Sequence, residues 1–264
     1  MTEKASGVDV PLRVKSFLAR VGEVALFGGK ALREALRPPY EVQETLRQIA
    51  EIGWLSLPLI AASGLAVGVV MSMHTRASLE RFGAEAMIPA GLALALIRET
   101  GPLITALLVS GRVGASIGAE LGAMRVTEQI DALESLAVDS FKFLAVTRVA
   151  ACMIALPILT TVTNFTGILG GYLAERTVSQ MSFELYFQRA FSAIEFSEYI
   201  PATLKTIVFG FIIGTVSSSL GYEARGGSAG VGRASTQSVV YSSICLILTN
   251  VLLVRLIFFF FPDR

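Results

Sequence analysis

The chain has 264 residues, of which 53% are hydrophobic and only 16% are charged, and its formal net charge is +1. Soluble domains carry about 25% charged residues, so this composition argues against a soluble protein, and the balanced charge gives no basic surface for nucleic acid. The two cysteines and the single histidine are too few for a disulfide framework or a zinc site. We therefore expect no metal and no other cofactor.

Residues 1–48 are predicted to form a cytoplasmic segment with a helix that lies in the membrane surface. Apolar side chains from Val14 to Leu36 recur at helical spacing, while lysines and arginines fall mainly on the other faces. A small soluble helical cap would show a similar pattern, but an apolar block follows directly, which favours the interfacial helix. Pro38 and Pro39 are expected to end it. No cleavable signal peptide is visible.

Residues 49–264 are predicted to form an all-α integral membrane domain of five spanning helices. Crossing a bilayer takes about 20 helical residues, and backbone groups in hydrocarbon must be bonded internally, as they are in a helix. Five apolar blocks meet this length: Ile52–Met73, Met87–Ser110, Val149–Leu173, Tyr199–Tyr222 and Ser235–Val254. The prolines within them, Pro58, Pro102 and Pro157, are expected to kink the helices rather than end them.

The orientation follows from the distribution of lysine and arginine. These residues are concentrated in the N-terminal segment and in the loops after the second and fourth blocks, which lie on one side of the membrane. Because positively charged loops stay in the cytoplasm, we expect a cytoplasmic N-terminus and, with five spans, a periplasmic C-terminus.

A short amphipathic helix is predicted between the second and third spans. One face is apolar and a second is acidic; the apolar members are Val126, Ile130, Leu133 and Ala137, and the acidic ones are Glu128, Asp131 and Glu134. Such a helix suits docking into a groove on a soluble partner. It would equally suit packing on its own bundle with the acidic side solvated, and the pattern does not decide between the two.

Three other segments carry expectations. Lys205 lies near the outer end of the fourth block and is expected to snorkel to the interface. The glycine-rich segment Gly227–Ala234 has Arg233 and Ala234 where a P-loop needs lysine and a hydroxyl residue, so we interpret it as a flexible cytoplasmic loop. The aromatic-rich segment Glu175–Glu198 is expected to contain a short helix at the outer interface.

Several motifs in and after the second block resemble one family. They are Arg98-Glu-Thr-Gly-Pro102, Gly111-Arg-Val-Gly114, Ala119-Glu-Leu-Gly122 and the run from Met124 to Glu134. In this order and spacing they are similar to the MlaE/YrbE permease family of MCE-type ABC transporters. The similarity extends from about Arg37 to the C-terminus. Ser140 and Thr147 stand where the family usually has proline, which affects only the loop before the third span.

The resemblance implies a transport subunit without enzymatic activity, in a bacterial inner membrane. It implies a homodimer that moves phospholipid or a similar lipid, driven by a separate ATP-hydrolysing subunit, with an MCE-domain protein on the periplasmic side and a STAS-domain protein as a further partner. The short helix would then be the coupling helix that docks into the ATPase, with these residues: Glu128, Gln129, Asp131, Leu133 and Glu134.

Arg98 and Glu99 are the candidate residues of the lipid pathway. They lie about 17 Å into the second block at 1.5 Å per residue, where each charge costs about 2.5–3.5 kcal/mol to insert. Adjacent residues on a helix do not face each other, so at least one needs a partner on another helix or subunit, or water. A structural polar lock is the alternative. Further pathway candidates, near the outer end of the first span, are Val69, Met73 and Leu79.

Two other functions fit the sequence less well. A proton-coupled secondary transporter could use Glu99 as its carrier, but the chain has no inverted repeats with paired broken helices. A membrane scaffold would not need charges within its spans. Dependence of transport on ATP would distinguish the permease from the secondary transporter. A lipid held by the purified chain would distinguish the permease from the scaffold.

Overall fold

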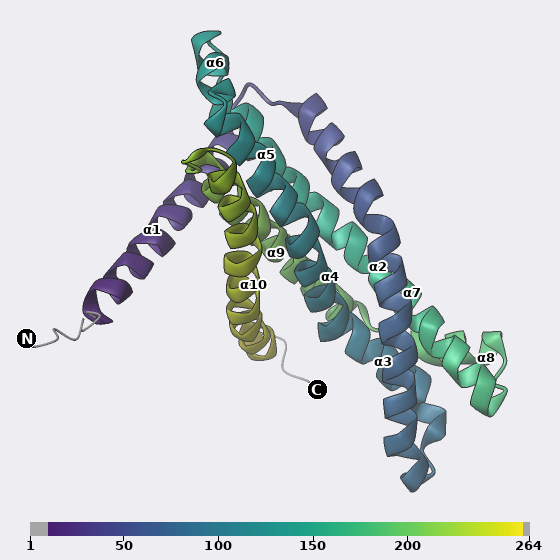
Figure 1. Ribbon diagram of the computed structural model, residues 1–264. Coiled ribbons are helices and arrows are strands. Elements are labelled where there is room, and N and C mark those ends of the chain that lie inside the picture. Colours follow the sequence, from purple (N-terminus) through teal and green to yellow (C-terminus); the bar gives the residue numbers. More distant parts are fainter. Residues whose placement is uncertain (1–9, 261–264) are drawn as a thin grey trace, which may run out of the picture.

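The computed structural model describes residues 10–260, with side chains for residues 19–257 and Phe259, and this part is helical without any strand (Figure 1). The α-helices are α1 (Val10–Ala35), α2 (Val42–Leu79), α3 (Ile88–Ala95), α4 (Gly101–Val109), α5 (Ala115–Val126), α6 (Gln129–Ser135), α7 (Thr147–Ser179), α8 (Phe183–Ser192), α9 (Phe196–Tyr222) and α10 (Gly227–Phe260).

Five helical stretches are long and apolar enough to cross a membrane, as predicted. They are Val42–Phe82, Glu85–Val126, Phe141–Ser179, Phe196–Tyr222 and Gly227–Ile257. Their ends differ from the expected blocks, because the helices continue into polar sequence beyond the hydrocarbon. With 38 residues, α2 is about 57 Å long, nearly twice the thickness of the hydrocarbon core. Pro58 and Pro157 lie inside α2 and α7 and do not end them.

The second span is one continuous helical stretch with two widened turns. π-Helical segments at Leu96–Thr100 and Ser110–Gly114 separate α3, α4 and α5, and a third, Phe141–Val146, precedes α7. Such turns break the regular ladder of backbone hydrogen bonds and often occur at functional sites. The first of them contains Arg98 and Glu99.

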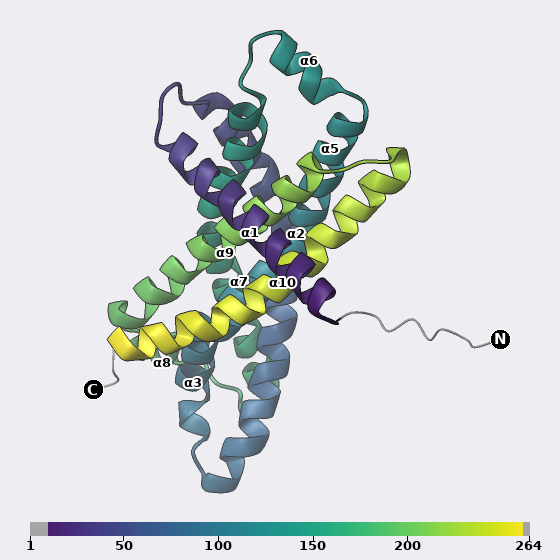
Figure 2. The same ribbon diagram turned by 90° about the vertical axis from the view of Figure 1, so that its left-hand side faces the viewer.

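The spans form a bundle around α7, which is the most buried of them. In its most apolar stretch 67% of residues are buried, against 17% for α10, so α10 leaves a long apolar face uncovered within one chain. Figures 1 and 2 show α6 at one end of the bundle, and α8 and the α2–α3 turn at the other.

Glycines allow the spans to approach closely. A Cβ on Gly68 would clash with the backbone of Gly167, which brings α2 against α7, and a Cβ on Gly210 would meet the backbone of Cys152 on α7. These glycines thus mediate packing within one chain, as small residues commonly do at helix interfaces in membranes.

The N-terminal helix diverges from the bundle in Figure 1. Arg20, near its middle, reaches Tyr241 on α10, and its C-terminal part packs against the spans. There, Gly28 lies against Phe211 and Thr215 of α9, and the ring of Phe27 packs edge-on against Phe141 at 5.0 Å. The predicted helix is therefore present from residue 10. The side chains of Val14, Phe17 and Leu18 lie outside the described set, and its position in the membrane surface stays a prediction.

Two predicted loop segments have definite structures. Gly227–Ala234 is not a loop: it forms the first two turns of α10, and the chain reverses before it at Gly226 and Gly227, which have positive φ values of 89° and 65°. The expected outer helix is α8, where the Ser182 hydroxyl caps the N-terminus by accepting from the Leu185 N–H at 3.4 Å. Burial raises the pKa of Tyr186 on this helix.

Candidate functional site

Glu99 is the centre of a polar network between three spans. Its Oε2 accepts a hydrogen bond from Lys205 Nζ on α9 at 2.6 Å, and its Oε1 accepts one from the Asn250 amide on α10. Lys205 is 2% exposed and Asn250 is 8% exposed, but the Glu99 side chain keeps 42% of its accessible surface. A carboxylate in the middle of a span is thus both paired and accessible from outside the chain.

Arg98 is directed to a different acidic partner. Its guanidinium forms an ion pair with Glu198 in the first turn of α9, with 41% of the Arg98 side chain and 18% of the Glu198 side chain exposed. Glu198 and Lys205 are seven residues apart and share one face of α9. The pairs therefore place two basic and two acidic groups side by side, which balances the charge within the described part of the site.

Pro102 contributes to this geometry. It lies four residues after Arg98 and has no N–H, so a regular α-helix would leave the Arg98 carbonyl without its usual donor; here that carbonyl accepts a hydrogen bond from Lys205 Nζ at 3.1 Å. The Lys205 ammonium is thereby held by a carboxylate and a carbonyl. This satisfies a charge that would be costly to bury alone.

The expectation that Lys205 snorkels to the interface is wrong. α9 begins at Phe196 rather than Tyr199, so Lys205 lies about 14 Å from the helix start at 1.5 Å per residue, and it turns inward to Glu99. We expected at least one charge of the second span to have a partner on another helix or subunit, or water, and the partners on α9 and α10 meet this expectation. Sequence reasoning missed Glu198 and Asn250; an amide inside the otherwise uncharged fifth block was the available signal.

The three other pathway candidates are not part of this network. Val69, Met73 and Leu79 lie on α2, whose main neighbour in the bundle is α7. Met73 is 62% exposed, and Val69 and Leu79 are partly buried. Their place in a lipid pathway stays a prediction.

The short helix between the second and third spans is α6, at the end of the bundle in Figure 1. Ile130 is 1% exposed and Leu133 packs against the core, so the apolar face docks onto the chain's own helices. Asp131 accepts from Arg125 Nη1 and Glu134 Oε1 accepts from Ser140 Oγ, both at 2.6 Å.

The remaining α6 residues leave a surface uncovered. Glu128, which precedes α6 with φ 60°, and Gln129 are exposed. Ala137 was expected on the apolar face, but α6 ends at Ser135 and Ala137 lies beyond it, exposed. Sequence reasoning missed Leu136, which is 75% exposed directly after the helix. Single exposed apolar side chains are common on protein surfaces, so the docking of a partner on Glu128, Gln129 and Leu136 stays a prediction.

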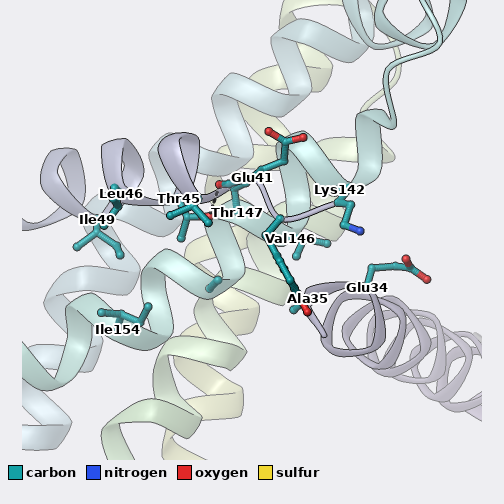
Figure 3. A pocket seen from close by; sticks show the side chains of 13 residues that line it. Glu34, Ala35, Glu41, Thr45, Leu46, Ile49, Lys142, Val146, Thr147 and Ile154 are labelled. Atoms are coloured by element: carbon teal, nitrogen blue, oxygen red, sulfur yellow. Dashed lines mark hydrogen bonds between the residues drawn. The ribbon is translucent and has the colours of Figure 1, made fainter. Parts of the chain in front are cut away.

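A cavity of about 310 Å³ lies where α1, α2 and α7 meet. Figure 3 shows it between Ala35 at the end of α1, Thr45 and Ile49 on α2, and Val146. Lys142 Nζ donates to the Arg37 carbonyl at 2.6 Å, which ties the α1–α2 connection to the start of the third span. None of the predicted site residues lines it.

Comparison with known proteins agrees with this architecture. The family model described as Permease MlaE matches residues 45–256. A probable ABC transporter permease protein of Rickettsia felis is 39% identical over 95% of this chain and 96% of its own length. The intermembrane phospholipid transport system permease protein MlaE of Haemophilus influenzae is 31% identical over 91% and 92%. The chloroplastic protein TRIGALACTOSYLDIACYLGLYCEROL 1 of Arabidopsis thaliana is 32% identical over 87% and 66%.

The five spans, the motifs around Arg98 and α6, and these similarities over nearly the whole chain agree with one another. The protein is a multi-pass membrane protein that belongs to the MlaE permease family of ABC transporter permeases.

Proposed function

We propose that the chain moves phospholipid between the inner membrane and a periplasmic MCE-domain protein, as a homodimer powered by a separate ATPase subunit. The observation that carries this proposal is the accessible Glu99 within the bundle, beside Arg98 and Lys205. A scaffold gains nothing from charges at this depth, because each is costly to insert. The name of the Haemophilus relative supports phospholipid as the cargo.

The charged site suits a zwitterionic or anionic headgroup. The half-exposed Arg98 guanidinium can meet a phosphate through two parallel hydrogen bonds. Glu198 Oε2 and Asn250 Oδ1 are buried acceptors with no hydrogen-bond partner among the described residues, and they can accept from an ammonium or a hydroxyl group. A headgroup that enters the site would thus lose its hydration water and gain contacts with both basic and acidic side chains. Its acyl chains would face the apolar surfaces of the spans.

The proposed orientation places α6 in the cytoplasm, where an ATPase is found, with the N-terminus on the same side and the C-terminus outside. Glu128, Gln129 and the exposed Leu136 then face the ATPase, with Asp131, Leu133 and Glu134 holding α6 in shape. A STAS-domain protein would join on the ATPase side. The opposite end, with α8 and the α2–α3 turn, would face the MCE-domain protein.

Reconstitution tests the proposal. The chain and its ATPase and MCE partners are placed in proteoliposomes, and transfer of fluorescent phospholipid is measured with ATP, without ATP, and with a proton gradient alone. We expect transfer only with ATP, and a loss of at least about tenfold in Arg98→Gln. Arg33→Gln, at an exposed arginine of α1, is the matched control. Transfer driven by the proton gradient alone would instead support the secondary transporter, and full transfer by Arg98→Gln would support the polar lock.

A further inference from the structure

A second charged site lies at the opposite end of the spans from Glu198. A cavity of about 350 Å³ is lined by Arg20 of α1, Arg225 of the α9–α10 turn and Arg233 of α10. Glu223 is the carboxylate that lines it with them. Within residues 19–257 none of the three guanidinium groups forms an ion pair; Arg233 donates to the Arg225 carbonyl at 3.3 Å, and Arg20 to the Tyr241 hydroxyl at 3.5 Å. Three basic groups and one acidic group thus line the cavity, and its net charge is positive.

The backbone turn brings these arginines together. Gly226 and Gly227 both have positive φ, which reverses the chain between α9 and α10 within a few residues. A Cβ on Gly226 would lie only 3.3 Å from Arg233 Nη2. A larger residue at this position would therefore be strained and would crowd the guanidinium.

A separate apolar cavity of about 100 Å³ lies beside the charged one, and Arg20 lines both. Its walls are Val21 and Val24 of α1, Val216 of α9, and Ile244 and Cys245 of α10. Along α10, Arg233 lies about 9 Å and Ile244 about 26 Å from the helix start, at 1.5 Å per residue. The charged cavity is thus nearer the aqueous end of the span, and the apolar one is deeper.

We infer that these two cavities together form a binding site for an anionic phospholipid, distinct from the pathway at Glu99. The lipid phosphate would lie among Arg225, Arg233 and Arg20, since guanidinium groups bind phosphate through paired hydrogen bonds. An acyl chain would occupy the apolar cavity between α1, α9 and α10. The order of charge and apolar surface along α10 matches the order of headgroup and chain in one leaflet. That this is the cytoplasmic leaflet rests on the orientation proposed above. The binding of the lipid does not depend on that orientation.

Native mass spectrometry of the full chain in mild detergent tests this site. Phosphatidylglycerol and phosphatidylcholine with identical acyl chains are titrated against the wild type, against Arg225→Gln/Arg233→Gln, and against Arg33→Gln/Arg47→Gln, which removes the same charge from exposed positions on α1 and α2. We expect phosphatidylglycerol to bind more tightly than phosphatidylcholine, and the Arg225/Arg233 variant to lose about tenfold in affinity. The control variant should bind as the wild type does.

Two further arms identify the occupant. Val24→Phe fills the apolar cavity and should weaken phosphatidylglycerol but leave any binding of inorganic phosphate unchanged. Inorganic phosphate that displaces the lipid at equal concentration would show a site for a free anion, and would overturn the proposal. So would equal affinity for the two lipids in the wild type, a result that needs no variant to fold. An Arg225/Arg233 variant that keeps phosphatidylglycerol but loses the ATPase would assign the arginines to a protein interface instead.

Discussion

Lys205 Nζ lies 2.6 Å from Glu99 Oε2, and this contact joins the fourth span to the charge in the second. Because Lys205 is almost fully buried, its ammonium depends on Glu99 and on the Arg98 carbonyl for compensation. Glu99 in turn has Asn250 as its other partner. The pair thus couples three spans at the depth where the lipid headgroup is proposed to pass.

Removing one partner of this pair should destabilise the chain. Lys205→Met leaves Glu99 without its cation, at a cost of about 2–3 kcal/mol on the scale for a charge at the centre of a span. Glu99→Gln/Lys205→Met removes both charges and should recover part of this loss, so the two changes should not be additive. Thermal unfolding of the wild type, the single variants and the double variant in detergent measures this coupling. Strictly additive effects would show that the contact carries no coupling energy.

A buried carboxylate lies near the end of the bundle that carries the α2–α3 turn. Glu175 is 1% exposed and accepts from Arg76, from Ser72 Oγ at 3.1 Å and from Ser179 Oγ at 3.3 Å. Arg76→Leu leaves this charge buried and unpaired, and should destabilise the chain by about 3–5 kcal/mol.

The control for this change is Arg81→Leu. Arg81 is exposed and forms no ion pair within the described part of the chain, so its loss should change stability by about 0.5 kcal/mol or less. Equal unfolding temperatures for the Arg76→Leu and Arg81→Leu variants would contradict the inference that Glu175 depends on Arg76.

The contact between α2 and α7 should be sensitive to a single methyl group. Gly68→Ala places a Cβ against the Gly167 backbone, which cannot move without separating the helices, and should cost about 1–3 kcal/mol. Gly53→Ala on the same helix meets nothing within 4 Å and should be neutral or stabilising by up to about 1 kcal/mol. Chemical denaturation of both variants measures the difference, and a neutral Gly68→Ala would refute close packing there.

The docking surface after α6 should depend on Leu136. Leu136→Asp adds charge to a side chain that is 75% exposed, so the fold should be retained while recovery of the ATPase in affinity purification falls about tenfold or more. Phe82→Asp is the matched control, because Phe82 is 82% exposed at the other end of the bundle. An ATPase that is lost equally from both variants, or from neither, would count against this surface.

Cysteine labelling tests the orientation. Phe82→Cys and Leu136→Cys are placed in a chain whose own Cys152 and Cys245 are replaced by alanine. A membrane-impermeant maleimide added to spheroplasts should label Phe82→Cys at once, and Leu136→Cys only after the membrane is opened. The reverse pattern would invert the proposed topology.

The number and kind of spans could be predicted from the sequence because an apolar block of 20 residues has few alternatives in a membrane protein. The ends of the spans could not be predicted, since a helix that leaves the hydrocarbon continues as long as its backbone bonds are satisfied. α10 illustrates this: its first two turns, Gly227–Ala234, contain three glycines, and local propensity favoured a loop. The absence of a Cβ at Gly230 lets the start of the helix lie close to the Arg225 backbone.

The partners of the buried charges were also beyond sequence reasoning. Arg98 and Glu99 could be recognised from the sequence as charges that are unfavourable within a membrane. Their partners, however, lie about 100 residues or more along the chain, on α9 and α10. Assigning Lys205 to the interface followed from a helix start placed three residues too late. An error of this size moves a lysine by nearly one turn and changes which partner it can reach.

The two π-helical turns of the second span rotate α3, α4 and α5 relative to one another about the helix axis. Each successive residue of an α-helix turns by about 100°, so a turn that accommodates one extra residue shifts every later side chain around the axis by that amount. Deleting one residue within Leu96–Thr100 could restore a regular helix without breaking the span. It would then rotate Glu99 away from Lys205 or turn α5 and α6 away from their present faces. In this protein a single-residue deletion is therefore a change of register between the Glu99 network and α6, not a loss of secondary structure.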